Sequence, residues 1–249
     1  QGCPTVEKAM ALAVVFSDRK VYTAEDPLKI RLEEGVHEIM GGQYGFMNVT
    51  CSHITFVGKG KDQTTVRGGF EVTNQQNVKF EKLTITNQSG NGLEMKGSET
   101  NVYVLKCVVK ECRLNGMFVE GGASFTATQC VFTGNICHGV VCRDADTKAR
   151  INDSTMHHNR MDGLVAVDRV VVDLHGTKTD IHSNKGHGIR TYNRAKVSIH
   201  LPPQHNTTHG NVGEDRFQFN RGSIANMNAD GTFTHVIVPQ EVVEDEDDY

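Results

Sequence analysis

Short runs of alternating apolar and polar residues recur through the middle of the chain, bounded by glycine, asparagine or aspartate. Leu83-Thr84-Ile85-Thr86 and Leu93-Glu94-Met95-Lys96 are two examples. A period of two is typical of strands that bury one face, whereas an amphipathic helix repeats every three to four residues. The pattern therefore predicts short strands from Leu28 to Leu201.

The runs return at a nearly constant interval. Five of them follow a glycine, and these glycines lie 24, 23, 24 and 25 residues apart, at Gly92, Gly116, Gly139, Gly163 and Gly188. Weaker copies begin at Gly45 and Gly69. A period of this length predicts a repeat architecture, in which each unit buries its apolar face against its neighbours. Such a fold grows coil by coil around one continuous core.

A second strand follows later in each repeat, and its alternation sets which side chains point inward. One inward column is expected to hold Leu83, Cys107, Cys130, Ser154 and Thr179, and the next Ile85, Val109, Phe132, Met156 and Ile181. Neighbours in a column should lie one coil, or about 4.8 Å, apart. Cys107 and Cys130 are expected to be free thiols packed in the core.

The N-terminal stretch has a different period. From Thr5 to Phe16 it predicts a helix whose apolar face holds Ala9, Leu12, Ala13 and Phe16, with Thr5 as N-cap. A helix before the first strand, Leu28 to Leu32, would cover the open end of the stack and its unpaired backbone edge.

The period and the Gly-apolar-x-apolar strand resemble the right-handed parallel β-helix of pectate-lyase-like proteins, with repeats of the carbohydrate-binding and sugar-hydrolase type. The resemblance covers about Leu28 to Leu201. It implies an all-β, single-stranded, right-handed parallel β-helix solenoid of about 7–9 coils with a short N-terminal capping helix. The expected division is a cap over 1–20, the β-helix over 21–201, an irregular C-terminal coil over 202–240 and an acidic disordered tail over 241–249.

The composition of the chain limits the kinds of partner that we expect it to bind. The net charge of -4 argues against nucleic acid binding, and no apolar run approaches the roughly 18 residues of a membrane span. Seven cysteines at irregular spacing are a poor disulfide framework, which slightly favours an intracellular location. No cofactor is expected.

Two columns of turn residues could carry chemistry. Asp144 and Asp168, five residues after the repeat glycine, should lie side by side, as a Ca²⁺ site or an acid/base pair would require. Other coils place Asn or Gly there, so we interpret the column as a series of tight turns. The column before the glycine is also interpreted as a turn position, and it holds Asn91, Asn115, His138, Asp162 and His187.

His157 and His182 are expected to point outward one coil apart, with Asp180 nearby. Two imidazoles could share a metal ion, but the pattern supplies no third ligand. No metal ligand is therefore assigned.

The outward positions of the strand after the glycine form the candidate binding surface. Phe118, Val141, Val165 and Val167 make an apolar stripe, with Arg143, Arg190 and Tyr192 beside it and Asp144 and Asp168 close by. Exposed apolar surface of this kind usually marks an interface or a groove. In the neighbouring row, Lys96, Glu120 and Arg143 alternate in charge. We interpret these opposite charges as stabilising the pairing of adjacent strands.

Two functions follow from this surface. The first is a non-catalytic module that binds a partner protein, a second copy of itself or a glycan. The alternative, suggested by the fold resemblance and by the group Asp144, Asp168, Arg143, Arg190 and Tyr192, is a polysaccharide-acting lyase, epimerase or hydrolase. No catalytic residue is assigned, and whether the protein is an enzyme stays open.

Overall fold

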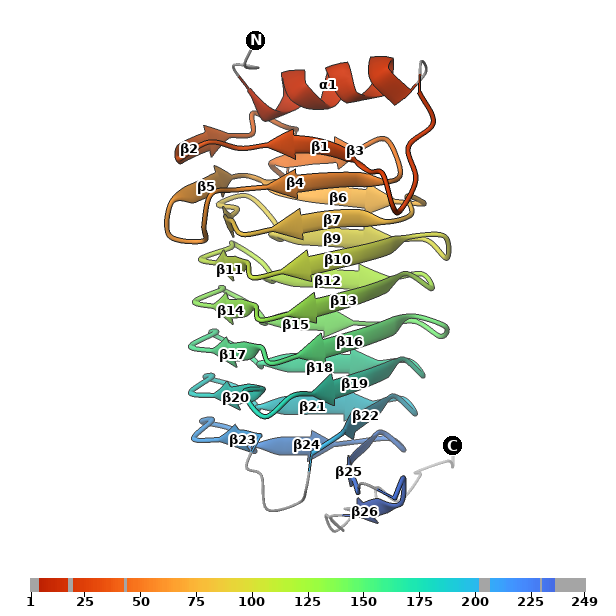
Figure 1. The fold of residues 1–249 in the computed structure, drawn as a ribbon. Coiled ribbons are helices and arrows are strands. Elements are labelled where there is room, and N and C mark those ends of the chain that lie inside the picture. Colours follow the sequence, from red (N-terminus) through yellow and green to blue (C-terminus); the bar gives the residue numbers. More distant parts are fainter. Residues whose placement is uncertain (1–4, 18–19, 43, 202–206, 229, 236–249) are drawn as a thin grey trace, which may run out of the picture.

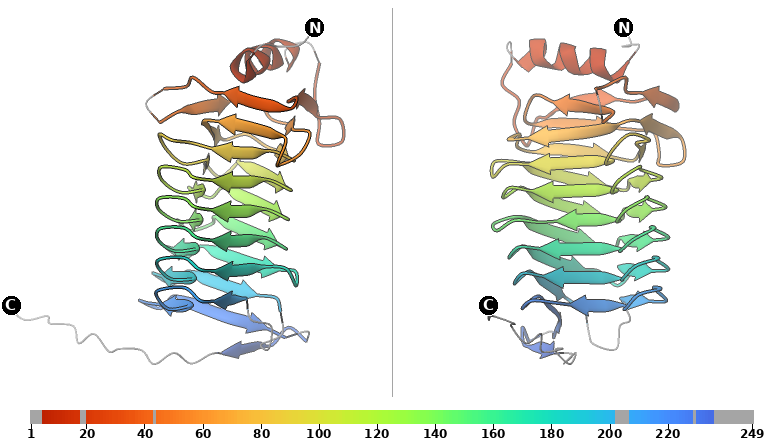
Figure 2. Two further views of the ribbon diagram at one scale, coloured as in Figure 1. Left: turned by 90° about the vertical axis from the view of Figure 1, so that its left-hand side faces the viewer. Right: turned by 180° about the vertical axis from the view of Figure 1, so that it is seen from behind.

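Three parallel sheets form the walls of a right-handed β-helix in the computed structural model (Figure 1). The structure describes residues 5–17, 20–42, 44–201, 207–228 and 230–235. We call the three sheets A, B and C in the order in which the chain enters them. Each coil contributes one strand to each sheet, and the coils stack along the solenoid (Figure 2).

The strands of each sheet follow one another at intervals of one coil. Sheet A contains β1 (Leu28–Arg31), β4 (Ile54–Val57), β7 (Val78–Glu81), β10 (Asn101–Leu105), β13 (Ser124–Thr128), β16 (Lys148–Asn152), β19 (Val171–His175), β22 (Lys196–Ile199), β25 (Ser223–Met227) and β26 (Phe233–His235). Sheet B contains β2 (Gly35–Glu38), β5 (Thr64–Arg67), β8 (Thr84–Thr86), β11 (Val108–Lys110), β14 (Val131–Thr133), β17 (Thr155–His157), β20 (Asp180–His182) and β23 (Thr208–His209).

Sheet C contains β3 (Phe46–Val49), β6 (Gly69–Thr73), β9 (Leu93–Lys96), β12 (Met117–Glu120), β15 (Val140–Cys142), β18 (Leu164–Val167), β21 (Ile189–Tyr192) and β24 (Arg216–Gln218). Eight strands in each of sheets B and C make about eight coils, which confirms the predicted all-β solenoid.

The predicted inward columns are confirmed. Ile85, Val109, Phe132, Met156 and Ile181 are paired in register from coil to coil, and all are 0 % exposed. The column from Leu83 to Thr179 is at most 1 % exposed. The core is therefore a continuous stack of like positions, as the period required.

A row of buried asparagines, which strand alternation does not predict, crosses the turns between sheets B and C. Asn135, Asn159 and Asn184 are 0 % exposed, and the row continues to Asn211. The Asn159 Oδ1 accepts from the backbone N–H and the side-chain amide of Asn135, while its Nδ2 donates to the Phe132 carbonyl and to the Asn184 Oδ1. Each amide thus satisfies backbone groups that the turn removes from the sheet ladders.

The N-terminal helix, α1 (Val6–Ser17), crosses the first coil as the predicted cap (Figure 1). The Thr5 Oγ1 accepts the Lys8 N–H at 3.1 Å, which confirms the N-cap. The predicted face was partly wrong: Val6, Met10 and Ala13 are buried, whereas Leu12 and Phe16 are 41 % and 48 % exposed. Both faces of the helix are apolar, so periodicity alone could not select between them.

Regular coiling does not end at Leu201. Strands β23, β24 and β25 extend all three sheets by a further coil, and β26 then pairs antiparallel with β25. The residues 202–206, with the Pro-Pro pair, lie outside the described residues. So do 236–249, which include Val236 to Val238, where the alternation of the sequence would also allow an edge strand, and the acidic tail. No helix in the described ranges has the length and apolar character to cross a membrane.

The asparagine row predicts a large penalty for losing one amide. In Asn159→Ala, the groups that Asn159 bonds stay buried without partners, so we expect a loss of about 2–4 kcal/mol in the free energy of unfolding, measured by urea denaturation. Asn101→Ala is the control, because Asn101 gives one side-chain bond to Ser124 on an outer face. It should cost less than about 1 kcal/mol. Equal losses in both variants would contradict a special role for the buried row.

Candidate functional site

The outer face of sheet C carries aromatic, apolar and guanidinium side chains in adjoining coils. The outward positions are paired in register in two rows, Phe118–Val141–Val165–Arg190–Phe217 and Val167–Tyr192. We call these seven residues with Arg143 the sheet C patch. Seven of the eight were predicted to lie together on this face; Phe217 was missed because β24 lies in a coil that the sequence pattern did not reveal.

The valines of the sheet C patch are less exposed than expected. Val141, Val165 and Val167 are 7 %, 4 % and 8 % exposed, although they point away from the core. They form a separate apolar cluster on which Phe118 and Tyr192 pack. The expected bare apolar stripe is therefore wrong: the larger side chains at its margins cover the valines and present the accessible surface.

Both arginines of the patch lie against aromatic rings. The Arg190 Cζ is 5.4 Å from the centroid of the Tyr192 ring and 5.9 Å from that of Phe217. The Arg143 Cζ is 5.6 Å from the Phe118 centroid, and its Nε lies 3.0 Å from the Glu120 carboxylate. These contacts fall in the range of cation–π interactions, which restrain the guanidinium groups while leaving donors directed to solvent.

The predicted charge alternation is present beside the patch. Lys96 lies within 4.0 Å of Glu71, Glu94 and Glu120, the outward carboxylates of three neighbouring coils. The acidic residues thus gather over β6, β9 and β12, whereas Arg190 lies on β21. The patch begins beside this acidic group, where Arg143 contacts Glu120, and extends along sheet C to β24.

The residues of the column before the repeat glycine share a hydrogen-bond acceptor in the side chain. They do not share a left-handed backbone conformation. The Asn115 Oδ1 accepts the His138 N–H, the His138 Nδ1 accepts the Asp162 N–H, and the Asp162 Oδ1 accepts the His187 N–H, at 3.1, 3.1 and 2.6 Å. The His187 Nδ1 accepts the Glu214 N–H at 2.9 Å. No residue of this column has a positive φ. Our turn interpretation of the column was therefore wrong: Asn, Asp and His recur because each places an acceptor at the δ position.

Asp162 joins this column to the sheet C patch. Its side chain is 4 % exposed, and its Oδ2 lies 3.3 Å from the His138 Nδ1 and 3.5 Å from the Arg190 Nη1. Burial raises the pKa of Asp162, but the hydrogen bonds and charges of His138, His187 and Arg190 outweigh it, so the pKa stays below its ordinary value. An ionised carboxylate beneath the patch therefore positions Arg190.

The turns from sheet C to sheet A confirm the turn interpretation of Asp144 and Asp168. Their φ angles are 73° and 58°, in the left-handed region, as is the φ of 56° at Asn193. The Asp144 Oδ2 accepts the Gly121 N–H at 3.1 Å, and the Asp168 Oδ1 accepts from the Asn193 amide at 2.8 Å. Both carboxylates thus bond to the adjacent turn. Among the described residues, no group of three potential metal ligands includes either of them.

A column of arginines follows these turn residues and was not predicted. Arg169, Arg194 and Arg221 have φ angles of 65°, 64° and 62°. The Arg169 N–H donates to the Asn193 carbonyl and the Arg194 N–H to the Asn220 carbonyl, so the turns are in register. All three side chains are exposed, and none forms an ion pair with a described residue. The signal was the dipeptide Asp-Arg or Asn-Arg at intervals of one coil.

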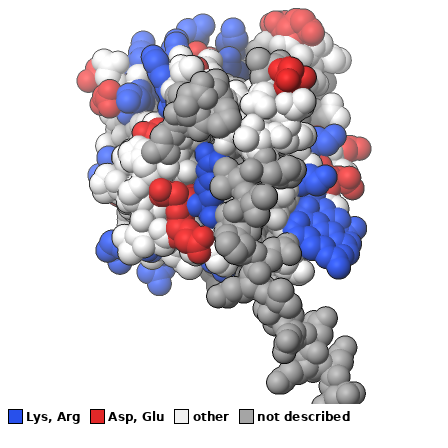
Figure 3. All heavy atoms as spheres, turned by 90° about the horizontal axis from the view of Figure 1, so that it is seen from below, with Lys and Arg blue, Asp and Glu red and all other residues white. Residues whose placement is uncertain are grey.

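The arginine column lines a shallow groove of about 670 Å³ along the turn edge, together with Asp144, Asp168, Asn193 and Asn220. Seen from the C-terminal end of the solenoid, basic side chains gather at one side of the molecule (Figure 3). Like charges on adjacent coils repel one another, so this edge favours an anionic ligand.

The core cysteines offer no nucleophile. Cys107 and Cys130 are buried and free, as expected, as are Cys112 and Cys142. Burial raises the pKa of Cys130 to about 11 and that of Cys112 to about 12. Thiols in such surroundings stay protonated near neutral pH.

Solved structures with a similar fold include enzymes named for pectin and mannuronan. Carrot pectin methylesterase aligns with a TM-score of 0.51 at 8% identity over 89% of this chain and 84% of its own. Pectin methylesterase from Yersinia enterocolitica aligns at 0.47 and 10% identity, covering 93% and 85%. The A-module of mannuronan C-5 epimerase AlgE4 from Azotobacter vinelandii aligns at 0.48 and 15%, covering 94% and 82%. At these identities the likeness concerns the fold alone.

No curated protein matches this chain in sequence. The family model described as "Right handed beta helix region" matches residues 33–156. The three sheets continue through the coils on either side of that range. The described residues therefore have the fold of a right-handed parallel β-helix, as the resemblance in sequence had implied.

Proposed function

We propose that this protein binds an extended anionic glycan, which lies across the sheet C patch and the arginine column beside it. The observation that carries the proposal is the column itself: Arg169, Arg194 and Arg221 are exposed, in register and unpaired among the described residues. Charges held in this way, at one edge of a protein of net charge -4, have a use in binding rather than in the stability of the coil.

The form of the surface favours a linear polymer. Successive coils present the same positions about 4.8 Å apart, so a chain of repeating units could make similar contacts with each coil. Tyr192 and Phe217 offer aromatic surface, and Arg190 offers donors that suit a carboxylate or a sulfate. A neutral glycan could use the aromatic rings but not the full set of charges.

A protein partner or a second copy of the chain fits this surface less well. Such an interface usually has an apolar centre, whereas the three valines of the patch are at most 8 % exposed. If the patch is an interface between copies, a glycan-free sample should sediment as a dimer, and Tyr192→Ala should return it to a monomer.

Removal of the arginine column should weaken binding of acidic polymers. In the triple variant Arg169→Gln, Arg194→Gln, Arg221→Gln, we expect roughly a tenfold or greater rise in Kd for polygalacturonate at low ionic strength. Calorimetric titration should show a much smaller change for neutral dextran. Glutamine keeps a long polar side chain at each turn, so the fold should be retained.

The matched control is Arg31→Gln, Arg113→Gln, Arg160→Gln. It removes the same charge from three exposed arginines outside the turn edge, which also lack ion pairs with described residues. It should leave the Kd within about twofold of the wild-type value. Equal weakening by both triples would mean that net charge alone attracts the polymer, and would contradict a localised site.

A second candidate is a polysaccharide-acting enzyme, in line with the names of the structural neighbours. The specific observation in its favour is the contact of His138 with the ionised Asp162, which itself holds Arg190 in the patch. The His138 Nδ1 lies 3.1 Å from the Asp162 backbone nitrogen and 3.3 Å from its carboxylate, so Nε2 is the ring nitrogen left for a solute. Such a ring could act as a general acid or base toward a sugar at the margin of the patch.

His138→Asn tests this candidate without removing the acceptor that the column needs. If His138 transfers a proton in the reaction, turnover of uronic-acid polymers should fall by about 100-fold or more while Kd is unchanged. Assays with and without Ca²⁺ cover both lyase and hydrolase chemistry. A catalytic His138 would be contradicted if the wild type did not turn over such polymers, or if the variant turned them over equally well. Neither result would bear on the binding proposal, which the arginine variants test.

A further inference from the structure

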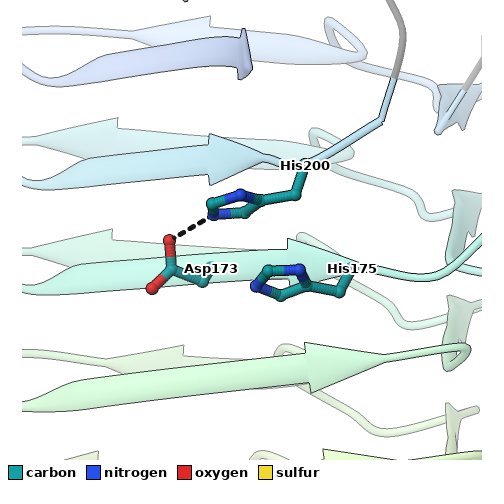
Figure 4. Close-up of side chains that lie close together, drawn as sticks. All are labelled: Asp173, His175 and His200. Atoms are coloured by element: carbon teal, nitrogen blue, oxygen red, sulfur yellow. Dashed lines mark hydrogen bonds and ion pairs between the residues drawn. The ribbon is translucent and has the colours of Figure 1, made fainter. Parts of the chain in front are cut away.

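Two histidines and an aspartate meet on the outer face of sheet A, away from the sheet C patch (Figure 4). The His200 Nε2 lies 2.7 Å from the Asp173 Oδ1, and the His175 and His200 rings stack at 3.9 Å between centroids with 12° between their planes. One donor atom from each of the three residues lies within 4.8 Å of the others. All three are partly buried.

The β-helix itself brings these side chains together. Asp173 and His175 are two residues apart on β19, so both point outward. His200 directly follows β22, and its N–H donates to the Leu174 carbonyl at 2.8 Å, which places its ring against that of His175. The positions of all three Cα atoms are thus set by ladder hydrogen bonds rather than by a long loop.

We propose that Asp173, His175 and His200 form a binding site for a divalent transition-metal ion, with Zn²⁺ as the best-suited ion. Two imidazoles and one carboxylate are a common ligand set for Zn²⁺, and three protein ligands leave at least one position for water or a solute. Small side-chain rotations would bring the donors from their mutual contacts onto a shared ion.

Among the described residues, the cluster's only ion pair is the contact between Asp173 and His200. Arg150, opposite Asp173 on β16, makes no ion pair with a described residue, so the Asp173 carboxylate is shared with His200 alone. Asn152 and Ser198 are the other outward neighbours.

A groove of about 370 Å³ runs along the same face from this cluster. Asp173, Arg150 and Lys148 contribute to its lining. A solute could therefore reach the open position of the metal, with a basic side chain beside it. This arrangement would suit a small anion as the further ligand.

A second histidine stack supplies the internal comparison. On sheet B, His157, His182 and His209 stack at 5.0 and 5.2 Å between centroids, and Asp180 lies 3.1 Å from the His209 Nε2. Among the described residues, however, only the sheet A cluster brings three donors within mutual reach of one ion. The outward pair His157 and His182 that the sequence predicted is present, but the better ligand set lies elsewhere.

The experiment titrates the full chain, without an affinity tag, with Zn²⁺ by calorimetry and with Co²⁺ by visible absorption. The wild type should bind one Zn²⁺ with Kd below about 10 µM and give Co²⁺ bands of a site with nitrogen and oxygen ligands. His175→Asn with His200→Asn should raise this Kd at least about 100-fold. The control, His157→Asn with His182→Asn, removes the same number of imidazoles and should leave the Kd unchanged.

Two results would overturn the proposal. One is wild-type binding weaker than about 100 µM, which is tenfold weaker than the expected limit. The other is loss of binding in the sheet B control with retention in the sheet A double variant. Thermal denaturation of both variants without metal distinguishes a lost ligand from a lost fold. Asp173→Asn provides a third arm: it keeps the shape but removes the charge, and should weaken Zn²⁺ binding by about tenfold.

Discussion

The buried side chains of a narrow β-helix must satisfy the backbone wherever the chain turns. The strands pair with the coils above and below, but the residues between strands lose those partners without gaining water. Here Asn135, Asn159, Asn184 and Asn211 supply both a donor and an acceptor at the turn from sheet B to sheet C. A second column accepts backbone N–H groups at the start of sheet C. These two rows allow the sharp corners on which the stacking of every coil depends.

The coil geometry also divides the outer surface into separate faces that could bind ligands. Because inward positions form the core and the two rows bond the backbone between sheets B and C, ligand contacts are left mainly to outward side chains and to the turns between sheets C and A. Sheet C presents aromatic rings and arginines, the adjoining turns present Arg169, Arg194 and Arg221, and sheet A presents the Asp173 cluster. Each feature spans two or more coils, so none could form within a single repeat.

The repeat period was enough to predict the fold, the inward columns and the outward rows, since all three follow from strict alternation within a constant coil. Prediction failed where alternation carries no information. It could not choose the buried face of α1, where the Glu7 side chain accepts the Met40 N–H and the Val6 face packs inward. It also misjudged the three outward valines, because their burial depends on the size of neighbouring side chains. His200 was not predicted because it lies just beyond the end of a strand. The arginine column was not predicted because its turns were considered only for residues that adopt a left-handed backbone conformation.

Different elements border the two ends of sheet A. Helix α1 lies over the first coil, whereas β26 runs antiparallel to β25 at the other end. A parallel strand at that end would offer the next molecule the same pairing that joins one coil to another, and the solenoid could then extend into a filament. A reversed last strand presents a different pattern of donors and acceptors, which a coil of the same protein does not match. In sheet A, the last described strand therefore does not repeat the parallel pairing that joins one coil to the next.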